Sequence, residues 1–504
     1  MGNTSESLGK IAKGAAIAFV GMLAFTFFEF VTRVIIARYA TQGEYGAFSI
    51  GFALLNIFVM ISCLGLQGGA TRCIAYFRGK GEDEKVAGIV YSSLQLSVVA
   101  GLFFFLVVFV SSDFLNEIFH LEQSTVLKLF AVAIPFLTVI EILSYIFIGF
   151  NRIKEKVFFR DILMYLLRVS CIVFAFILGF GFLGMMYAYL LPTVIVAVVF
   201  AGYAVKKLSI QLKDNVVIRK KLFRFSIPLL VTFLSTVIII RADTLMLGYF
   251  KTSEIVGLYN TAVPIAQLLP IFLTSMGFIY VPISSQLYSK NLVEEMRRNY
   301  AVLTKWVLMA TLPFFFTIFL FPEAVLTIIF GPSYEHAGSA LRILLLGALV
   351  QVLTGPNALT LVVAGKTKLN MVDDLIGLIV NISLNFFLIP TMGITGAAIA
   401  SSISLITINV LKSTQIFWLH KIHPFTLNFI KSIATSTVFI SVIYLLFVSL
   451  SSTSITIWML IIFFFLFLTV QVAGLIITKS FDKEDIILLQ EAKKILNKNV
   501  NSPV

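Results

Sequence analysis

Residues 14–36 have the sequence GAAIAFVGMLAFTFFEFVTRVII, an apolar run interrupted by Glu29 and Arg33. Residues 225–249, FSIPLLVTFLSTVIIIRADTLMLGY, form a second such run that carries Arg241 and Asp243. An α-helix crosses a bilayer core about 30 Å thick with about 20 apolar residues, so each run is long enough to span it. Because charges inside such helices avoid lipid, both runs predict a membrane protein with a polar interior.

The composition is typical of an integral membrane protein. The chain has 504 residues, of which 59% are hydrophobic and 12% charged, and its mean hydropathy is +1.00. Its apolar runs lack the polar and apolar alternation of membrane-barrel strands. We therefore expect an all-α polytopic membrane protein with about 14 transmembrane helices. The expected spans lie near residues 14–36, 46–68, 87–110, 128–150, 161–183, 185–205, 225–249, 256–282, 301–321, 338–363, 369–390, 394–417, 427–449 and 455–477.

Several matched features indicate that the first half of the chain is repeated in the second. The two arginines lie 208 residues apart in corresponding runs, and Gly46 and Gly257 lie 211 residues apart at the starts of helices. Residues 181–184 (GFLG) recur as residues 393–396 (GITG). An even number of spans in each half lets both copies enter the membrane in the same direction, as parallel repeats do.

The repeat predicts the domain organisation. We expect two six-helix bundles related as parallel repeats, with a cleft between them. The last two spans have no counterpart in the repeat, which predicts a lipid-facing helix pair or a cover for a lateral opening. The expected parts are an N-terminal bundle (1–205), a cytoplasmic linker (206–224), a C-terminal bundle (225–420), the extra helix pair (427–478) and a cytoplasmic tail (479–504).

The distribution of basic residues predicts the orientation. Lys and Arg concentrate at both ends of the chain and in alternate loops, whereas the intervening loops hold few, such as Lys128, Lys251 and Arg342. By the positive-inside rule both termini are cytoplasmic in the cell membrane. The net charge of +13 therefore indicates topology and attraction to anionic membrane lipids, and does not indicate a nucleic-acid partner. Apolar spacing within 481–499 predicts a helix on the inner membrane surface.

The depth of each charge separates site candidates from membrane anchors. Arg33 lies about 12 Å from the middle of its span, so it is either a site residue or an anchor that reaches the headgroups. Glu29 lies one turn earlier on the same face and is expected to pair with it. Arg241 and Asp243 lie about 5 and 8 Å from the middle of their span and are expected to face a cavity. They point about 200° apart, so each needs its own partner.

Three further charges are weaker candidates. Glu141 lies about 3 Å from the middle of the fourth span and Arg168 about 6 Å from the middle of the fifth, so we expect them to be partners. Either they form a structural ion pair or they serve substrate binding or proton coupling. Arg72, at the inner end of the second span, is either a site residue or an ordinary anchor.

The sequence carries no enzyme signature. A phosphate-binding Gly-x-x-x-x-Gly-Lys-Ser/Thr loop is missing, and the longest cytoplasmic loop is too short for a catalytic domain. The three Cys and four His have no metal-ligand spacing. We therefore expect no catalytic residue, no metal and no cofactor. Any energy that the protein uses must then come from an ion gradient, the membrane potential or the concentration of its substrate.

Short motifs in both halves carry a resemblance to a family. They are TRVIIAR (32–38), EYG (44–46), LGL (64–66) and TR (71–72), followed by RADTLMLG (241–248), GLY (257–259) and GITGAAIA (393–400). With these motifs the chain resembles the polysaccharide-biosynthesis flippases of the multidrug/oligosaccharidyl-lipid/polysaccharide exporter superfamily. The resemblance covers about residues 8–480.

The resemblance implies export of a polyprenyl-(di)phosphate-linked oligosaccharide or repeat unit by alternating access. A proton or sodium ion is the candidate coupling ion, and a glycan polymerase or transferase is a candidate partner. Guanidinium groups bind phosphate oxygens in bidentate fashion, so the arginines are expected to hold the anionic head. The substrate-site candidates are Arg33, Arg241, Asp243, Glu29, Arg38, Arg72, Glu141 and Arg168.

Two alternatives remain open. A cation-coupled multidrug antiporter of the same superfamily would use the acids to bind cationic drugs, although twelve spans rather than fourteen would favour that function. A non-transporting scaffold of a glycan-assembly complex would move no lipid-linked sugar at all.

Overall fold

The computed structural model describes residues 2–121, 124–208, 216–450, 455–478 and 480. Those residues contain helices and no strand, which confirms the all-α prediction. The helices are α1 (Gly2–Tyr39), α2 (Gln42–Ser62), α3 (Leu66–Gly79), α4 (Asp83–Val110), α5 (Ser112–Ile118), α6 (Ser124–Gly149), α7 (Ile153–Lys156), η1 (Val157–Leu163), α8 (Met164–Ile177), α9 (Gly181–Leu208), α10 (Val216–Phe250), α11 (Ser253–Leu268), α12 (Ile271–Ser289), α13 (Val293–Leu320), α14 (Pro322–Phe330), η2 (Pro332–Ala337), α15 (Gly338–Thr354), α16 (Asn357–Val363), α17 (Thr367–Met392), α18 (Ile394–His420), α19 (Leu427–Leu450) and α20 (Ile457–Ile477).

Helix length and hydropathy make this a multi-pass membrane protein. Thirteen helices of the described chain are long and apolar enough to cross a membrane. The expected span 161–183 is absent from that set because it falls on the end of η1, on α8 and on the start of α9, and η1 and α8 are helical segments of only 7 and 14 residues. The expected span 256–282 is divided between α11 and α12 at Pro270, whose missing N–H and bulky ring interrupt a helix.

The described chain forms two compact units. Unit 1 comprises residues 1–264, 329–340 and 374–401, and unit 2 comprises residues 265–328, 341–373 and 402–504. The predicted order of bundles, linker and helix pair stays a prediction. Much of the expected linker and nearly all of the expected cytoplasmic tail, including its surface helix, lie outside the described residues.

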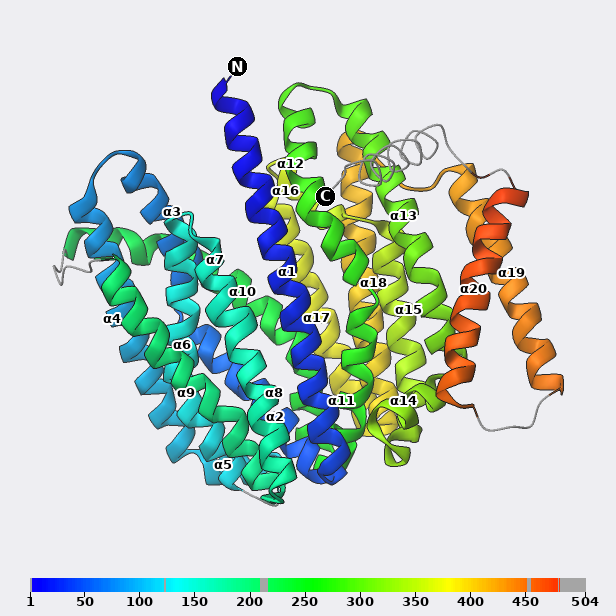
Figure 1. Ribbon diagram of the computed structural model, residues 1–504, viewed down its shortest axis with the longest axis horizontal. Coiled ribbons are helices and arrows are strands. Elements are labelled where there is room, and N and C mark those ends of the chain that lie inside the picture. Colours follow the sequence, from blue (N-terminus) through cyan, green and yellow to red (C-terminus); the bar gives the residue numbers. More distant parts are fainter. Residues whose placement is uncertain (1, 122–123, 209–215, 451–454, 479, 481–504) are drawn as a thin grey trace, which may run out of the picture. The chain divides into compact units, whose positions relative to one another are not determined.

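Unit 1 has a core built by neighbouring apolar helices. In Figure 1 the helices α4, α6 and α9 run side by side, and α6 packs against both of the others. Phe147 on α6 and Phe159 on η1 stack against Phe200 on α9, with ring centres 5.3 and 4.5 Å from it. Such rings bury large apolar areas, so they fix the helices that carry the polar residues of this unit.

Unit 2 holds the expected extra helix pair. Helices α19 and α20 pack against each other, and both pack against α13 (Figure 1). Phe463 on α20 lies 4.8 Å from the ring of Phe321, directly after α13, and Gln471 donates to the carbonyl oxygen of Met309 at 3.0 Å. The pair is therefore joined to α13 by aromatic contacts and by a buried hydrogen bond.

Two matched glycines of the repeat touch each other within unit 1. A Cβ atom at Gly46 would lie 1.7 Å from the carbonyl oxygen of Ser253, and one at Gly257 would lie 2.1 Å from that of Gln42. Each glycine thus meets the backbone four residues before the other glycine. This reciprocal contact brings the starts of α2 and α11 together and is consistent with the predicted repeat, which itself stays a prediction.

Replacing Gly46 or Gly257 with alanine is expected to force α2 and α11 apart. The added methyl group would overlap backbone atoms, and overpacking of this kind costs about 1–3 kcal/mol or more. The midpoint of thermal unfolding of the purified protein should fall in both variants. Gly202→Ala is the matched control, because nothing lies within 4 Å of its Cβ position on α9. Unchanged midpoints in the first two variants would contradict the close contact.

Candidate functional site

The matched arginines meet at one aromatic ring of unit 1. The guanidinium carbon of Arg33 on α1 lies 4.9 Å from the centre of the Phe52 ring, and that of Arg241 on α10 lies 4.6 Å from it. A guanidinium group near an aromatic face is stabilised by about 0.5–2 kcal/mol. Phe52 on α2 therefore brings together two charges that are 208 residues apart in the sequence.

A third arginine joins them through a shared carboxylate. Glu29 lies 3.2 Å from Nε of Arg33 and, through its other oxygen, 3.6 Å from Nη1 of Arg168. The predicted pair between Glu29 and Arg33 is thereby confirmed. Arg168 is 1% exposed, donates to the Thr193 hydroxyl at 3.1 Å and lies 4.0 Å from the centre of the Tyr189 ring. Its position is thus fixed by contacts with two other helices, α1 and α9.

We call Arg33, Arg168, Arg241, Glu29 and Phe52 the arginine cluster. Among the described residues, Glu29 is the only carboxylate in ion-pair contact with any of its arginines. The cluster therefore carries three positive charges and one negative charge. Since a buried charge without a counter-ion is costly, this arrangement favours an anionic ligand. Guanidinium groups offer such a ligand paired N–H donors.

Burial reverses the expected ranking of the two matched arginines. The side chain of Arg33 is only 8% exposed, so it does not reach outward as a membrane anchor. The anchor alternative is wrong because α1 continues to Tyr39 and the side chain of Arg33 pairs with Glu29 and covers Phe52. Arg241 is the more accessible of the two, with intermediate exposure.

The predicted pairing of Glu141 with Arg168 is wrong. Glu141 instead accepts from Arg160, whose Nη2 and Nε atoms lie 2.6 and 2.7 Å from the same carboxylate oxygen. Arg160 lies on the π-helical segment η1, which packs against α6, whereas α8 turns Arg168 toward α1. Asp161 completes this group with Arg160 and Lys156, at 3.4 and 2.6 Å. Two acids balance two bases there, which is typical of a structural ion-pair network.

Two other candidates lie away from Phe52. Arg38 donates from Nε to the carbonyl oxygen of Ile329 at 2.7 Å. Arg72 is exposed on α3, and its guanidinium carbon lies 4.5 Å from the centre of the Phe225 ring. The structure therefore does not bring either residue into the arginine cluster.

Asp243 has a separate polar site, which we call the Asp243 site. Its carboxylate, 5% exposed, accepts from the Tyr259 hydroxyl at 2.7 Å and from the amides of Asn385 and Asn381 at 2.7 and 3.1 Å. The Ser401 hydroxyl also donates to it. The side-chain oxygen of Asn385 is buried and has no hydrogen-bond partner among the described residues. The Asp243 site thus brings several oxygen atoms together in a buried position. Oxygen atoms are the ligands that hard cations prefer.

Helix α10 carries one residue of each site, Arg241 of the arginine cluster and Asp243 of the Asp243 site. It is continuous from Val216 to Phe250. Arg241 contacts Phe52 on α2, whereas Asp243 contacts α11, α17 and α18. The prediction that Arg241 and Asp243 do not pair agrees with this geometry. Any movement of α10 would displace both groups together.

Sequence reasoning missed the neutral members of both places. Asn381 and Asn385 lie four residues apart in an apolar span, and this spacing places both amides on one face of the helix. This spacing could have predicted a pair of polar side chains facing the protein interior. Phe52 gave no signal, because it is one of 50 phenylalanines in the sequence.

Comparison with known proteins identifies the family. The family model described as polysaccharide biosynthesis protein matches residues 11–288, which is more than half of the chain. The chain belongs to this family. A second model, MatE, matches residues 228–387. The predicted family resemblance is thereby confirmed.

The chain is similar to two archaeal membrane proteins and to a solved flippase structure. An uncharacterized membrane protein of Methanocaldococcus jannaschii is 24% identical over 74% of this chain and 77% of its own length. The probable low-salt glycan biosynthesis flippase Agl15 of Haloferax volcanii is 26% identical over 41% of this chain and 44% of its own length. The structure of the lipid II flippase MurJ in an inward closed conformation has a TM-score of 0.72 at 13% identity, covering 94% of this chain and all (100%) of that one. This last likeness shows the fold.

Removing the charge of Glu29 is expected to destabilise the protein. Glu29→Gln leaves the buried Arg33 and Arg168 without their carboxylate, and breaking a buried ion pair in this way costs about 3–5 kcal/mol. Unfolding of the purified protein in mixed micelles measures the loss. Glu323→Gln is the control, because Glu323 and its partner Arg342 are both 39% exposed and such pairs contribute about 0–1 kcal/mol. Equal losses in both variants would contradict the charge balance described for the cluster.

Proposed function

We propose that the protein is a flippase that moves a polyprenyl-(di)phosphate-linked oligosaccharide or repeat unit across the cytoplasmic membrane by alternating access. Its family, together with the name of the Haloferax volcanii relative as a glycan biosynthesis flippase, supports a lipid-linked glycan as the substrate. The observation that carries the proposal is the excess of positive charge in the arginine cluster. A phosphate or diphosphate is the group of such a substrate that cannot cross hydrocarbon unaided.

In this proposal the arginine cluster holds the anionic head. Arg33 and Arg241 flank one ring and can donate to phosphate oxygens, while Glu29 keeps Arg33 and Arg168 in place. Guanidinium groups suit this task because they stay charged and donate in a planar fork. The sugars would occupy the aqueous cavity, and the prenyl chain would remain in lipid. Glu141 belongs to a balanced ion-pair network and is assigned a structural role.

The net positive charge of the arginine cluster argues against the export of cationic drugs. An antiporter of cationic drugs needs acidic groups that are free to meet its substrate. Here Glu29 already lies between two arginines, and Asp243 accepts hydrogen bonds from four side chains. A cationic drug would therefore meet a positive surface at Phe52. A transport measurement distinguishes the scaffold alternative from the flippase, because a scaffold moves no lipid.

We further propose that the Asp243 site binds the coupling ion, either sodium or a proton. A sodium ion would be held by the Asp243 carboxylate, the unpartnered oxygen of Asn385 and the Ser401 hydroxyl, after rotation of the present donors. A proton would instead bind the carboxylate directly. In either case the added positive charge changes the contacts of α10 with α17 and α18. Because α10 also carries Arg241, the ion can bias the substrate site.

The proposed topology places both termini in the cytoplasm, as the basic loops predict. A glycan polymerase or transferase would then receive the substrate after translocation. The repeated bundles would provide the two alternating arrangements. These assignments rest on the sequence pattern and on the proposed substrate.

Arg33→Ala and Arg241→Ala are each expected to slow flipping strongly, because each removes a donor to the anionic head. Losing one charge-assisted hydrogen-bond pair of about 2–3 kcal/mol slows transport by about 30-fold to 150-fold. The measurement uses proteoliposomes loaded with a fluorescent polyprenyl-diphosphate oligosaccharide and a membrane-impermeant quencher. Arg342→Ala, which removes an arginine from unit 2, is the matched control and should flip at the wild-type rate.

The same assay distinguishes the alternatives. Wild-type rates in both arginine variants would refute the proposed site. Transport of a cationic dye in place of the lipid would support the antiporter. A wild-type protein that moves neither compound would support the scaffold.

Asp243→Asn is expected to remove the dependence of transport on the coupling ion while leaving lipid binding intact. Asparagine keeps the size of the side chain and removes its charge. Transport is measured with an imposed sodium gradient, a proton gradient or neither, and lipid binding is measured in micelles. The control Asp113→Asn alters an exposed acid that pairs with Lys128. A variant that still responds to the gradient would contradict the assignment of the Asp243 site.

A further inference from the structure

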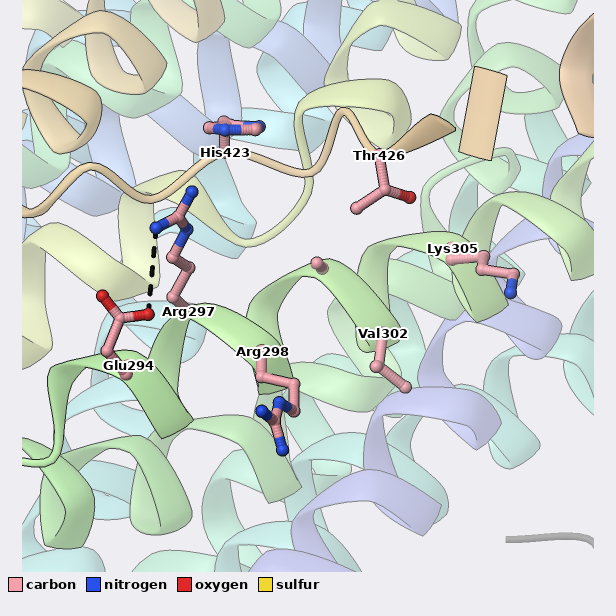
Figure 2. A pocket seen from close by; sticks show the side chains of 8 residues that line it. Glu294, Arg297, Arg298, Val302, Lys305, His423 and Thr426 are labelled. Carbon is pink, nitrogen blue, oxygen red and sulfur yellow. Dashed lines mark ion pairs between the residues drawn. The ribbon is translucent and has the colours of Figure 1, made fainter. Parts of the chain in front are cut away.

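A cavity of about 280 Å³ lies in unit 2, separate from the residues discussed so far. Figure 2 shows it between the first half of α13 and the segment that connects α18 to α19. It is lined by Glu294, Arg297, Arg298, Ala301, Val302, Lys305, His423 and Thr426. We call it the basic pocket, because three of these side chains are cationic and one is acidic, although Lys305 is buried and donates to the carbonyl oxygen of Ser480 at 2.6 Å.

The two walls of the basic pocket are fixed by buried side chains. On α13, Met296 and Tyr300 are 0% and 1% exposed, so the first half of this helix is held in place by buried side chains. On the connecting segment, Ile422 is 2% exposed and packs in the same apolar cluster as Met296 and Tyr300. Pro424 is buried as well. The spacing between Arg297 and His423 is therefore set before any ligand arrives.

The polar groups of the basic pocket suit a phosphate group. Arg297 extends toward His423 (Figure 2), and Thr426 lies on the facing segment, where its hydroxyl oxygen accepts from the backbone N–H of Phe429 at 3.2 Å and its O–H can still donate. Glu294 lies 3.8 Å from Arg297, and its side chain is 86% exposed. An exposed pair of this length contributes little, so Arg297 can exchange that carboxylate for phosphate oxygens at small cost. Arginine binds phosphate through paired donors, and a hydroxyl adds a neutral one.

Size and location narrow the ligand. The basic pocket, with a volume of about 280 Å³, gives room for a phosphate-bearing headgroup. The loops around 290–298 and 412–431 are predicted to face the cytoplasm, where anionic phospholipids are concentrated. A phosphate at this level is available from lipid headgroups of the inner leaflet or from solution.

We propose that the basic pocket is a binding site for a phosphate-bearing anion, distinct from the proposed substrate site. The bound phosphate would join α13 to the segment that leads into α19. Since α19 and α20 also pack on α13, the anion would hold the extra helix pair against that helix. This inference does not depend on the flippase proposal.

The test compares lipid retention by three forms of the full-length protein in micelles. Native mass spectrometry counts the phosphatidylglycerol and phosphatidylcholine molecules that stay bound. The wild type should retain phosphatidylglycerol preferentially, and the double variant Arg297→Gln/Arg298→Gln should lose this preference by about tenfold or more. Lys206→Gln/Lys207→Gln removes the same charge from exposed positions at the end of α9 and should behave as wild type.

Inorganic phosphate, added as a competitor, distinguishes the two sources. Displacement of the lipid at millimolar phosphate identifies a site open to soluble phosphate, and resistance identifies a headgroup site. Arg297→Lys/Arg298→Lys keeps the charge and should retain part of the preference, which separates lost binding from lost folding. The inference is overturned if the wild type shows no preference and binds no phosphate, or if the Gln double variant keeps the wild-type preference.

Discussion

Three arginines gather around one glutamate and Phe52, with Arg33 and Arg168 paired to Glu29 and Arg241 over the ring, and this imbalance of buried charge is the constraint on which the proposed function depends. Hydrocarbon gives no hydration to an unpaired cation, so the protein must supply a carboxylate, an aromatic face or a ligand. Glu29 and Phe52 supply the first two. The remaining positive charge is what an anionic headgroup would neutralise. The same surplus makes the place unfavourable for a cationic drug.

Helix α10 is continuous, so it connects the arginine cluster mechanically with the Asp243 site. Arg241 and Asp243 are two residues apart and face different partners, so one helix connects the arginine cluster with a buried carboxylate. An ion that binds Asp243 competes with the amide and hydroxyl donors from α11, α17 and α18. Any resulting shift of α10 changes the position of Arg241. Coupling in the proposed transporter therefore needs no long chain of intermediates, because a single rigid element links both sites.

Much of the fold and part of the site were predictable from the sequence. Apolar run length determined the helices, and i,i+4 spacing determined the pair of Glu29 with Arg33. The partner of Glu141 was not predictable, because a π-helical segment turned Arg160 rather than Arg168 toward α6. Estimated depth along a helix also misjudged Arg33, since depth ignores which neighbouring helix covers a side chain. Phe52 and the asparagines of α17 were not predicted as site residues, because the prediction relied on charged residues within apolar spans and these residues are neutral.

The most direct test of the central claim is a structure of the protein with a short-chain polyprenyl-diphosphate oligosaccharide bound. The account predicts the diphosphate between the guanidinium groups of Arg33 and Arg241, beside the Phe52 ring, with Glu29 still bridging Arg33 and Arg168. A diphosphate located elsewhere in the protein, with Arg33 and Arg241 unchanged around Phe52, would contradict it.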